Sequence, residues 1–264
     1  MTIDAHTIGR LEAASARFTV VWAEAHRRRP GNPLGIEIRE FGRATAVAAR
    51  ERPDLDFMNI VVGLGGVDAG QIEAIAGFYR RHGLRARIEL PPDPEAAHLM
   101  RALTRQGGAQ VGFWTRLAAV TGDAHRPADG RVRQVGVGES PLFGRVWAEG
   151  MGIPQGERGE AAAAAAAWAE DPGVTCYLAE AGGEAAAGAA LLVHERVGFL
   201  AIASTRPDYR RRGLQAALIA ARVQAACEAA CDLVSALCEF GSASQRNLER
   251  AGLTVAYTPA VWRL

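Results

Sequence analysis

The spacing of apolar residues alternates between a helical and a strand-like period along the chain. Near the start, Leu11, Ala14, Phe18 and Trp22 recur every three or four positions, which predicts a helix with one buried face. In the rest of the first half, the patterns predict helices at 39–50, 69–82 and 95–106, and strands at 58–64, 85–92 and 109–118. Helices and strands therefore alternate.

The second half repeats this alternation. Its patterns predict helices at 141–150, 157–170, 213–231 and 245–251, and strands at 174–181, 186–195, 197–205, 232–239 and 253–264. Gly182 and Gly183 supply a turn between the first two of these strands. The order of elements predicts an α/β (α+β) fold in which mixed, mostly antiparallel sheets are flanked by helices.

The organisation predicts two domains that are copies of one fold. The stretch 121–131 is polar, contains Gly and Pro, and lacks periodicity, so it is the predicted linker between domains at 1–120 and 132–264. A weak internal repeat relates 102–117 to 247–264. The matching positions in these two segments are Leu103, Arg105 and Gly107 in the first, and Leu248, Arg250 and Gly252 in the second.

Charge and composition exclude several classes of partner. The 264 residues carry a formal net charge of +1, and every fixed side-chain cation is an arginine because the chain has no lysine. No global field attracts nucleic acid or an anionic membrane, so we expect neither as a partner. The chain shows no signal-like start and no apolar run long enough to span a bilayer, which predicts a cytoplasmic protein.

The four cysteines do not predict a metal site. Cys176, Cys227, Cys231 and Cys238 lie among apolar neighbours, without a CxxC pair or nearby histidines. We therefore expect buried free thiols and no bound metal.

The stretch 199–227 has the order strand, basic turn, glycine, helix. Arg210, Arg211 and Arg212 precede Gly213, after which an apolar helix begins. The first amides of a helix have no intrahelical acceptor and carry partial positive charge, so they bind phosphate groups. Glycine leaves room for phosphate oxygens, and guanidinium groups add donors. Three arginines before a glycine are also typical of a solvated turn, and only the flanking strand and helix favour an anion site.

This segment resembles the coenzyme A motif of the GNAT superfamily of N-acetyltransferases, in which Gln or Arg is followed by x-x-Gly-x-Gly/Ala. Arg210 and Gly213 match the motif, whereas Gln215 stands where the superfamily has a residue with almost no side chain. The resemblance covers the whole second half. It identifies the chain as a tandem acetyltransferase-like protein with a degenerate N-terminal copy.

The resemblance implies acetyl-CoA as cosubstrate and a set of contacting residues. By similarity, the pantetheine arm lies along the strand that ends at Ser204 and Thr205, where a backbone amide steadies the acyl oxygen. The expected cofactor-binding residues are Ser204, Thr205, Arg210, Arg211, Arg212, Gly213, Leu214, Gln215, Ala216, Ser244 and Asn247. In the last helix, Ser244 is the expected N-cap and Gly252 the terminator.

The catalytic groups are not identified by the sequence. Glu195 and Glu239 are both candidates for the general base that deprotonates an amine. The superfamily often has a tyrosine that protonates the departing thiolate, and Leu248 occupies the matching position. Tyr257 or water are the alternatives for that proton.

The first half has no comparable anion site. After the strand at 58–64 come Gly65, Gly66 and Asp68, with no arginine and with an acid that repels phosphate. We expect this domain to pack on its partner and shape the acceptor pocket. The predicted function is transfer of an acetyl group from acetyl-CoA to a primary amine, of a small molecule or a protein, by direct attack. The alternative is a non-catalytic acyl-CoA-binding or regulatory module, which the departures at Gln215 and Leu248 favour.

Overall fold

The computed structural model describes residues 2–124 and 129–264, which divide into two compact units. Residues 116–256 form the C-terminal unit, and residues 2–115 together with 257–264 form the N-terminal unit. The last segment of the chain is therefore part of the N-terminal unit. Residues 125–128 of the predicted linker at 121–131 lie outside the described part of the chain.

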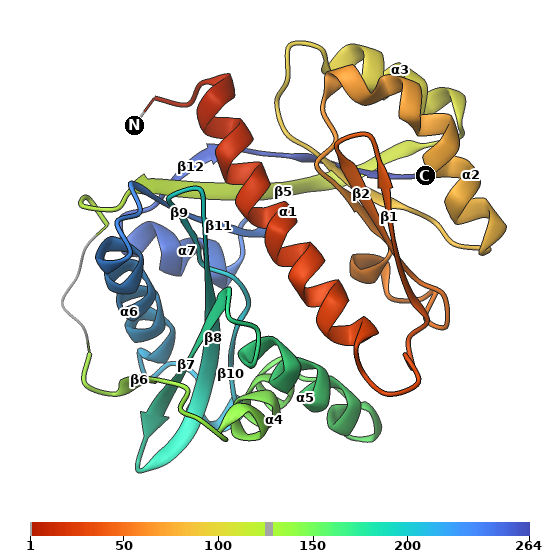
Figure 1. The fold of residues 1–264 in the computed structure, drawn as a ribbon. Helices are drawn as coiled ribbons and strands as arrows, with labels where there is room; N and C mark the ends of the chain where they lie inside the picture. Colours follow the sequence, from red (N-terminus) through yellow and green to blue (C-terminus); the bar gives the residue numbers. More distant parts are fainter. Residues whose placement is uncertain (1, 125–128) are drawn as a thin grey trace. The chain divides into compact units, whose positions relative to one another are not determined.

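The N-terminal unit is a mixed sheet with helices on both faces (Figure 1). Its strand order is β1-β2-β3-β4-β13-β5, in which only β3 and β4 are parallel among the described pairs. Helices α2 and α3 cover one face, and α1 covers the other. The bounds are α1 Ala5–Arg27, β1 Ile36–Phe41, β2 Ala44–Ala49, β3 Ile60–Val62, α2 Ile72–Arg81, β4 Arg87–Leu90, α3 Ala96–Arg105, β5 Ala109–Val120 and β13 Ala260–Arg263, with 3-10 helices η1 Asp56–Met58 and η2 Gly66–Gln71.

The predicted helix at 39–50 is wrong, because this segment forms the hairpin of β1 and β2. Gly42 takes the left-handed conformation (φ 63°) in the turn, and Phe41 pairs with Ala44 across it. Strand β2 also pairs with β3, so it is a central strand with both faces covered. A strand buried on both faces is apolar throughout and lacks the alternation that marks a half-exposed strand.

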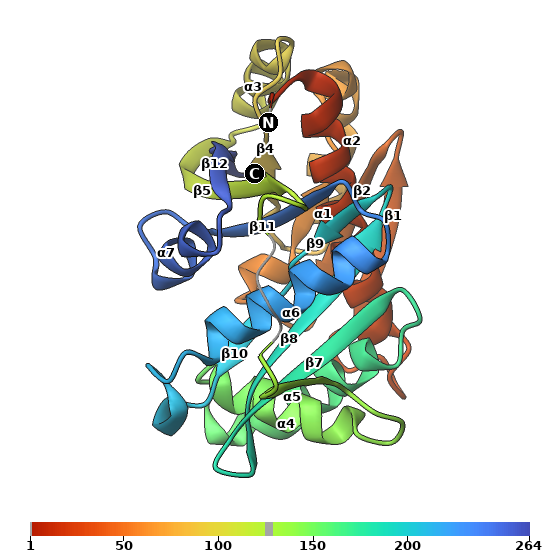
Figure 2. The same cartoon turned by 90° about the vertical axis from the view of Figure 1, so that its left-hand side faces the viewer.

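The C-terminal unit is a second set of strands between helices (Figures 1 and 2). Its strand order is β5-β11-β9-β8-β7-β6, while β10 pairs with β8 and β12 with β5. Helices α6 and α7 pack on one face, and α4 and α5 lie on the other. The bounds are β6 Val132–Gln134, α4 Ser140–Gly150, α5 Gln155–Ala169, β7 Val174–Ala181, β8 Glu184–His194, β9 Val197–Phe199, β10 Ala203–Thr205, η3 Pro207–Tyr209, α6 Leu214–Glu228, β11 Leu233–Glu239, α7 Ala243–Arg250 and β12 Thr254–Tyr257.

The prediction of two separate sheets is not met. Strand β5 belongs to both strand orders, so the thirteen strands found in the described residues form one hydrogen-bonded sheet. Most other elements confirm their predictions within a few residues, and Gly182 and Gly183 form the expected turn between β7 and β8, both with positive φ values. The predicted strand 197–205 is divided into β9 and β10 by residues 200–202.

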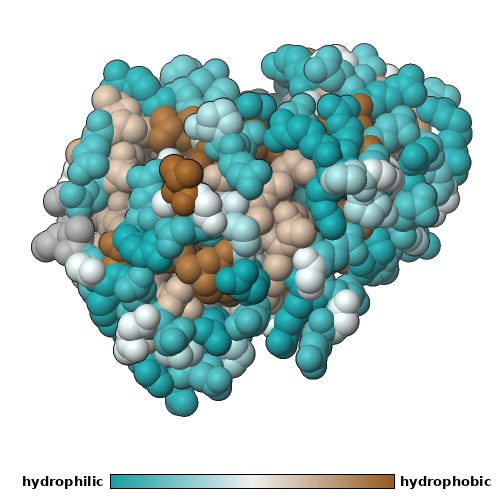
Figure 3. Space-filling model, turned by 60° about the horizontal axis from the view of Figure 1, so that its bottom comes forward, coloured by the Kyte–Doolittle hydropathy of each residue, from teal (hydrophilic) through white to brown (hydrophobic). Residues whose placement is uncertain are grey.

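One face of the molecule shows a mainly hydrophilic surface. On the face drawn in Figure 3, hydrophilic side chains dominate and hydrophobic ones form small separate patches. Within residues 2–124 and 129–264, no helix has both the length and the apolar character that a membrane crossing requires. Cys176, Cys231 and Cys238 are buried free thiols as expected, whereas Cys227 is exposed.

Candidate functional site

The turn before α6 has an unusual backbone. Gly213 is the N-cap residue and is left-handed (φ 79°, ψ 2°), and Arg211 is left-handed as well (φ 63°). Positive φ is rare for a residue with a branched or long side chain, and such strain gathers at functional sites. A left-handed residue followed by helical ones turns successive amides toward one side, which forms an anion-binding concavity.

The backbone amides of residues 211–216 are available to a ligand. The first helical hydrogen bond runs from the Ala217 amide to the Gly213 carbonyl at 3.1 Å. Within the described parts of the chain, the amides before it donate to no protein acceptor, and no side chain caps the helix. Arg211, Arg212, Gly213 and Ala216 are exposed, so this end of α6 faces solvent. No acid lies in its first turn. These properties fit a diphosphate group.

The three arginines of the motif have different surroundings. Arg210 donates to two backbone carbonyls, from Nε to Thr205 at 3.3 Å and from Nη2 to Gly150 at 3.2 Å. Arg212 donates to the Asp208 carbonyl and lies over the Tyr209 ring, with 5.1 Å from Cζ to the centroid. The exposed Arg211 side chain forms no hydrogen bond with the residues that the structure describes. Arg210 therefore braces the turn, while Arg211 is available to an anion.

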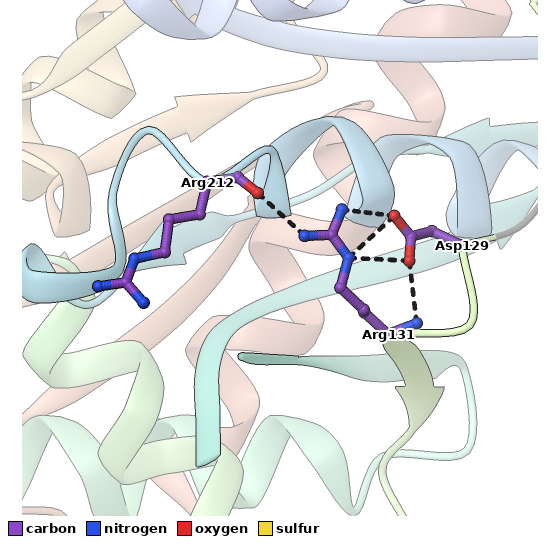
Figure 4. Close-up of polar contacts among 3 residues, drawn as sticks. All are labelled: Asp129, Arg131 and Arg212. Carbon is purple, nitrogen blue, oxygen red and sulfur yellow. Dashed lines mark hydrogen bonds and ion pairs between the residues drawn. The ribbon is translucent and has the colours of Figure 1, made fainter. Parts of the chain in front are cut away.

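Arg131 is a cation of this turn that the sequence reasoning missed. Its Nη1 donates to the Arg212 carbonyl at 3.0 Å, and its other nitrogens contact the Asp129 carboxylate (Figure 4). Hydrogen bonds from Arg131 lower the pKa of Asp129 to about 2, so this pair is charged at neutral pH. Arg131 falls at the end of the predicted linker, where no motif marks it. Only the folded chain places it beside Gly213.

Strand β10 leaves one edge open. Among the described residues it pairs only with β8, with Ala203, Ser204 and Thr205 opposite Ala189, Gly188 and Ala187. Because hydrogen bonds alternate along an antiparallel pair and the Arg206 amide bonds to the Ala186 carbonyl, the Ser204 backbone faces β8. The backbones of Ala203 and Thr205 therefore face the free edge. Alternation implicates Ala203 as a site residue, which the sequence analysis omitted.

The two predicted strand residues are tied to the surrounding elements. The Ser204 hydroxyl donates to the Trp147 carbonyl of α4 at 3.0 Å. The Thr205 hydroxyl accepts from Gln215 Nε2 at 2.9 Å. Gly150, at the end of α4, packs so closely here that a Cβ on it would lie 2.5 Å from the Ser204 hydroxyl oxygen. Gln215 is thus bound to the strand.

Helix α7 begins two residues earlier than predicted. Its N-cap is Ser242, whose hydroxyl accepts from the Gln245 amide at 3.1 Å, and Ser244 lies exposed inside the helix. Asn247 accepts a hydrogen bond from Arg250. Neither Ser244 nor Asn247 bonds to the turn at 210–216 in the described structure. Gly252 ends the helix with φ 96° as expected.

Both positions considered for a proton donor, Leu248 and Tyr257, are buried. Leu248, at the position of the superfamily's tyrosine, is 4% exposed and belongs to the apolar core under α6. Tyr257 is buried in the N-terminal unit, where its hydroxyl donates to Glu12 Oε1 at 2.7 Å.

The strand topology separates Glu195 from Glu239. Strands β9 and β11 are parallel, and the Leu200 amide still bonds to the Ser235 carbonyl. Beyond that point β10 pairs with β8 alone, so the sheet opens at the C-terminal ends of β9 and β11. Glu239 ends β11 at this open end. Glu195 lies in the turn before β9, at the opposite end.

The corresponding turn of the N-terminal unit is closed by protein acids. After β3, the Gly65 amide donates to Asp68 at 2.9 Å and the Gly66 amide to Asp93 at 2.8 Å. These carboxylates occupy the amides that a phosphate would need.

The same unit has an open, mainly apolar cavity of about 650 Å³ between α1, β5 and the segment that follows β4.

Comparisons with known proteins identify the family and the fold. The acetyltransferase (GNAT) domain family matches residues 99–242, which are more than half of the chain. No curated protein sequence matches significantly. A GCN5-related N-acetyltransferase from Kribbella flavida is 17% identical, with a TM-score of 0.62 over 96% of this chain and 95% of that one.

Two further solved structures share the fold. A GCN5-related N-acetyltransferase from Sphaerobacter thermophilus is 15% identical, with a TM-score of 0.58 over 95% of this chain and 91% of that one. A tandem GNAT protein from the clavulanic acid biosynthesis pathway is 13% identical, with a TM-score of 0.60 over 99% and 95% of the two chains. At these identities the likeness shows the fold alone. The family match, together with the amide-lined turn before α6, shows that the chain belongs to the GNAT acetyltransferase family.

Proposed function

We propose that the protein is an N-acetyltransferase that transfers an acetyl group from acetyl-CoA to a primary amine by direct attack of the amine on the thioester carbonyl. Family membership implies an acyl-CoA cosubstrate. The observation that carries the proposal is the exposed row of amides at 211–216, which no protein group caps among the described residues. This row offers the hydrogen bonds and partial positive charge that a diphosphate requires.

In this proposal the turn before α6 binds the diphosphate of coenzyme A, and β10 binds its pantetheine arm. The amides from Arg211 to Ala216 and the Arg211 guanidinium hold the diphosphate. The pantetheine arm adds to the free edge of β10, where Ala203 presents its backbone. An amide at the start of this edge donates to the thioester oxygen as negative charge develops there. Ser204, Thr205, Arg210 and Gln215 keep the strand and the turn in register.

Glu239 is the general base in this proposal. It lies where the sheet opens, and it is exposed, so it can deprotonate the incoming amine directly or through water. Glu195 lies at the far end of the parallel pair and is a matched control. We expect Glu239→Gln to lower kcat by about 10²-fold or more, the usual scale for loss of a general base, and Glu195→Gln to leave it unchanged.

Binding and turnover together test the proposal. Calorimetric titration with acetyl-CoA measures the cosubstrate site, and release of free thiol across a panel of primary amines measures transfer. Binding with thiol release supports an enzyme. Binding without thiol release for any amine supports the alternative of an acyl-CoA-binding module, which the buried Leu248 favours. Absence of binding refutes the proposed site.

We also propose that the chain arose by duplication, with domains at 1–120 and 132–264 joined by 121–131. The two segments of the weak repeat share a local geometry: the amide after Gly107 bonds to Leu103, and the amide after Gly252 bonds to Leu248. Both glycines have positive φ values. Scanning calorimetry tests the proposal, since acetyl-CoA should shift the unfolding transition of one domain more than that of the other.

A further inference from the structure

Arg222 is a charged residue inside the core of the C-terminal unit. It lies on α6 and is only 2% exposed. Its neighbours on the helix, Leu218, Ile219 and Val223, are buried in the apolar cluster that joins α6 to the sheet. Neither the coenzyme A motif nor the proposed contacts with substrate include it.

The guanidinium of Arg222 bonds to three backbone carbonyls. Its Nε donates to Leu218 on its own helix at 3.0 Å. Its Nη1 donates to Ala190 on β8 at 3.2 Å and to Ala201 at 3.0 Å. Ala201 belongs to the segment 200–202 that separates β9 from β10. One side chain therefore links the coenzyme A helix to the point where the sheet opens.

The hydrogen bond from Arg222 to the Ala190 carbonyl stands where backbone pairing between segment 200–202 and β8 is expected. Extending the register of β10 and β8 by one residue places Ile202 opposite Ala190. In a regular ladder the Ile202 amide would donate to the Ala190 carbonyl, as the Arg206 amide does to Ala186. Instead that carbonyl accepts from Arg222, and the Ile202 amide has no acceptor in the described chain. The Ala190 amide still donates toward the 201–202 segment, which stays attached to β8.

Burial of a charged guanidinium group in this apolar cluster is energetically unfavourable. Burial lowers the pKa of Arg222 to about 10, so the group remains protonated at neutral pH inside an apolar cluster. Apolar side chains of similar volume commonly stabilise a core as well or better than buried charges. The hydrogen bonds that Arg222 makes to the opening of the sheet are what an apolar residue would not reproduce.

We propose that Arg222 is a positioning residue for acyl transfer, which holds segment 200–202 so that the backbone amides of Ile202 and Ala203 face the thioester oxygen. The proposal rests on the acetyl-CoA site described above and deepens it. Arg222 touches neither substrate. It acts by occupying the Ala190 carbonyl and fixing the Ala201 peptide, so that donors are directed to the oxygen before the substrate arrives.

The test measures the thioester carbonyl itself. In [1-¹³C]acetyl-CoA bound to the wild-type protein, hydrogen bonds from the two amides should shift the infrared carbonyl band to lower frequency than in buffer. Arg222→Met should return the band to its position in buffer and lower kcat with the best amine of the panel by about 10- to 100-fold, the usual effect of a displaced donor. Affinity for coenzyme A should change by about twofold or less, because the diphosphate amides share no partner with Arg222.

Val223→Ala is the matched control, because it also removes buried volume from α6 and lowers the melting temperature. It should leave the carbonyl band in place. If Arg222→Met keeps the shifted band and kcat, its role is structural only and the proposal is wrong. Arg222→Lys gives a second measurement. The lysine side chain is shorter and lacks the Nε donor, so its ammonium stops short of the two carbonyls that Nη1 reaches, and the variant should also lose the band shift.

The free wild-type protein provides a readout that needs no variant. Rapid hydrogen exchange of the Ile202 amide, slowed by acetyl-CoA, supports the proposal, and a protected Ile202 amide in the free protein overturns it. The two levels of failure are distinguishable. A wild type that binds no acetyl-CoA refutes the proposed function and this role with it, whereas a normal wild type beside an unaltered Arg222→Met refutes this role alone.

Discussion

The substitution Gly213→Asp tests whether the turn before α6 binds the diphosphate. Gly213 is exposed, and a Cβ there would lie 3.6 Å from the nearest heavy atom, Arg131 Nη2, which is an ordinary contact. The added side chain therefore clashes with no neighbouring group, and its remaining steric cost is the strain of a left-handed backbone at φ 79°. A carboxylate at this position stands beside the amides that would hold two phosphate charges.

The expected effect follows from Coulomb's law. At about 5 Å, each like-charge pair costs about 0.8 kcal/mol at the dielectric of bulk water, so two pairs cost about 1.6 kcal/mol. Affinity for coenzyme A should fall by about 15-fold, and by more if the site excludes water. With coenzyme A at about a hundred times the wild-type Kd, ligand stabilisation should fall from about 2.7 to about 1.2 kcal/mol.

Two controls separate charge from backbone strain. Gly213→Asn has nearly the same shape without the charge, and asparagine tolerates the left-handed backbone. Gly182→Asp adds the same charge at another exposed left-handed glycine (φ 65°), in the turn between β7 and β8. Calorimetric titration should find near-normal affinity in both. If Gly213→Asp binds coenzyme A as tightly as Gly213→Asn, the diphosphate lies elsewhere and the site is wrong.

Three further substitutions probe the surroundings of the site and the core. Gln215→Ala removes the bond to Thr205 and should lower the free energy of unfolding by about 1 kcal/mol. Because the end of β10 and the start of α6 are then less well ordered before binding, the affinity for coenzyme A in titration should fall by about threefold, and a loss of more than about tenfold would show that Gln215 also binds the ligand directly. Gly150→Ala places a carbon 2.5 Å from the Ser204 hydroxyl oxygen and should destabilise by about 1 to 3 kcal/mol in urea unfolding, so unchanged stability would contradict this close packing. Burial lowers the pKa of His26 from 6.5 to about 4, so the unfolded chain takes up the proton first and stability falls on acidification. Between about pH 7.5 and 5 the loss is about 2 kcal/mol, and it should be absent in His26→Phe.

The spacing of apolar residues predicted most elements because one face of each element is buried and the other is exposed to solvent. It failed at β2, where Ala44, Ala46, Val47 and Ala48 are all buried and the apolar pattern carries no period. It also joined β9 to β10, since the break at 200–202 is made of apolar residues like the strands around it. At this break the Ala201 carbonyl accepts a hydrogen bond from Arg222, about twenty residues later in the chain, and no local pattern carries that contact.

The motif drew attention to the turn before α6 but not to the surroundings of each residue. Glycine followed by an apolar pattern predicted a helix that begins after Gly213, and the left-handed conformation of Gly213 is seen only in the structure. The sequence could not show that Arg210 is turned inward to carbonyls, nor that Arg131 approaches from a segment some eighty positions away, because both contacts depend on tertiary packing. The register of β10 against β8 then showed that the backbone of Ala203 faces the free edge and that of Ser204 faces β8, which the sequence alone cannot show.

Thr205 holds the end of β10 against the start of α6, and this affects ligand affinity. Its carbonyl is held by Arg210 and its hydroxyl by Gln215, so the end of β10 and the start of α6 are clasped together without ligand. The two surfaces proposed for the arm and the diphosphate are thereby preorganised at a fixed separation. A long flexible cosubstrate then loses its own freedom on binding, while the protein loses little.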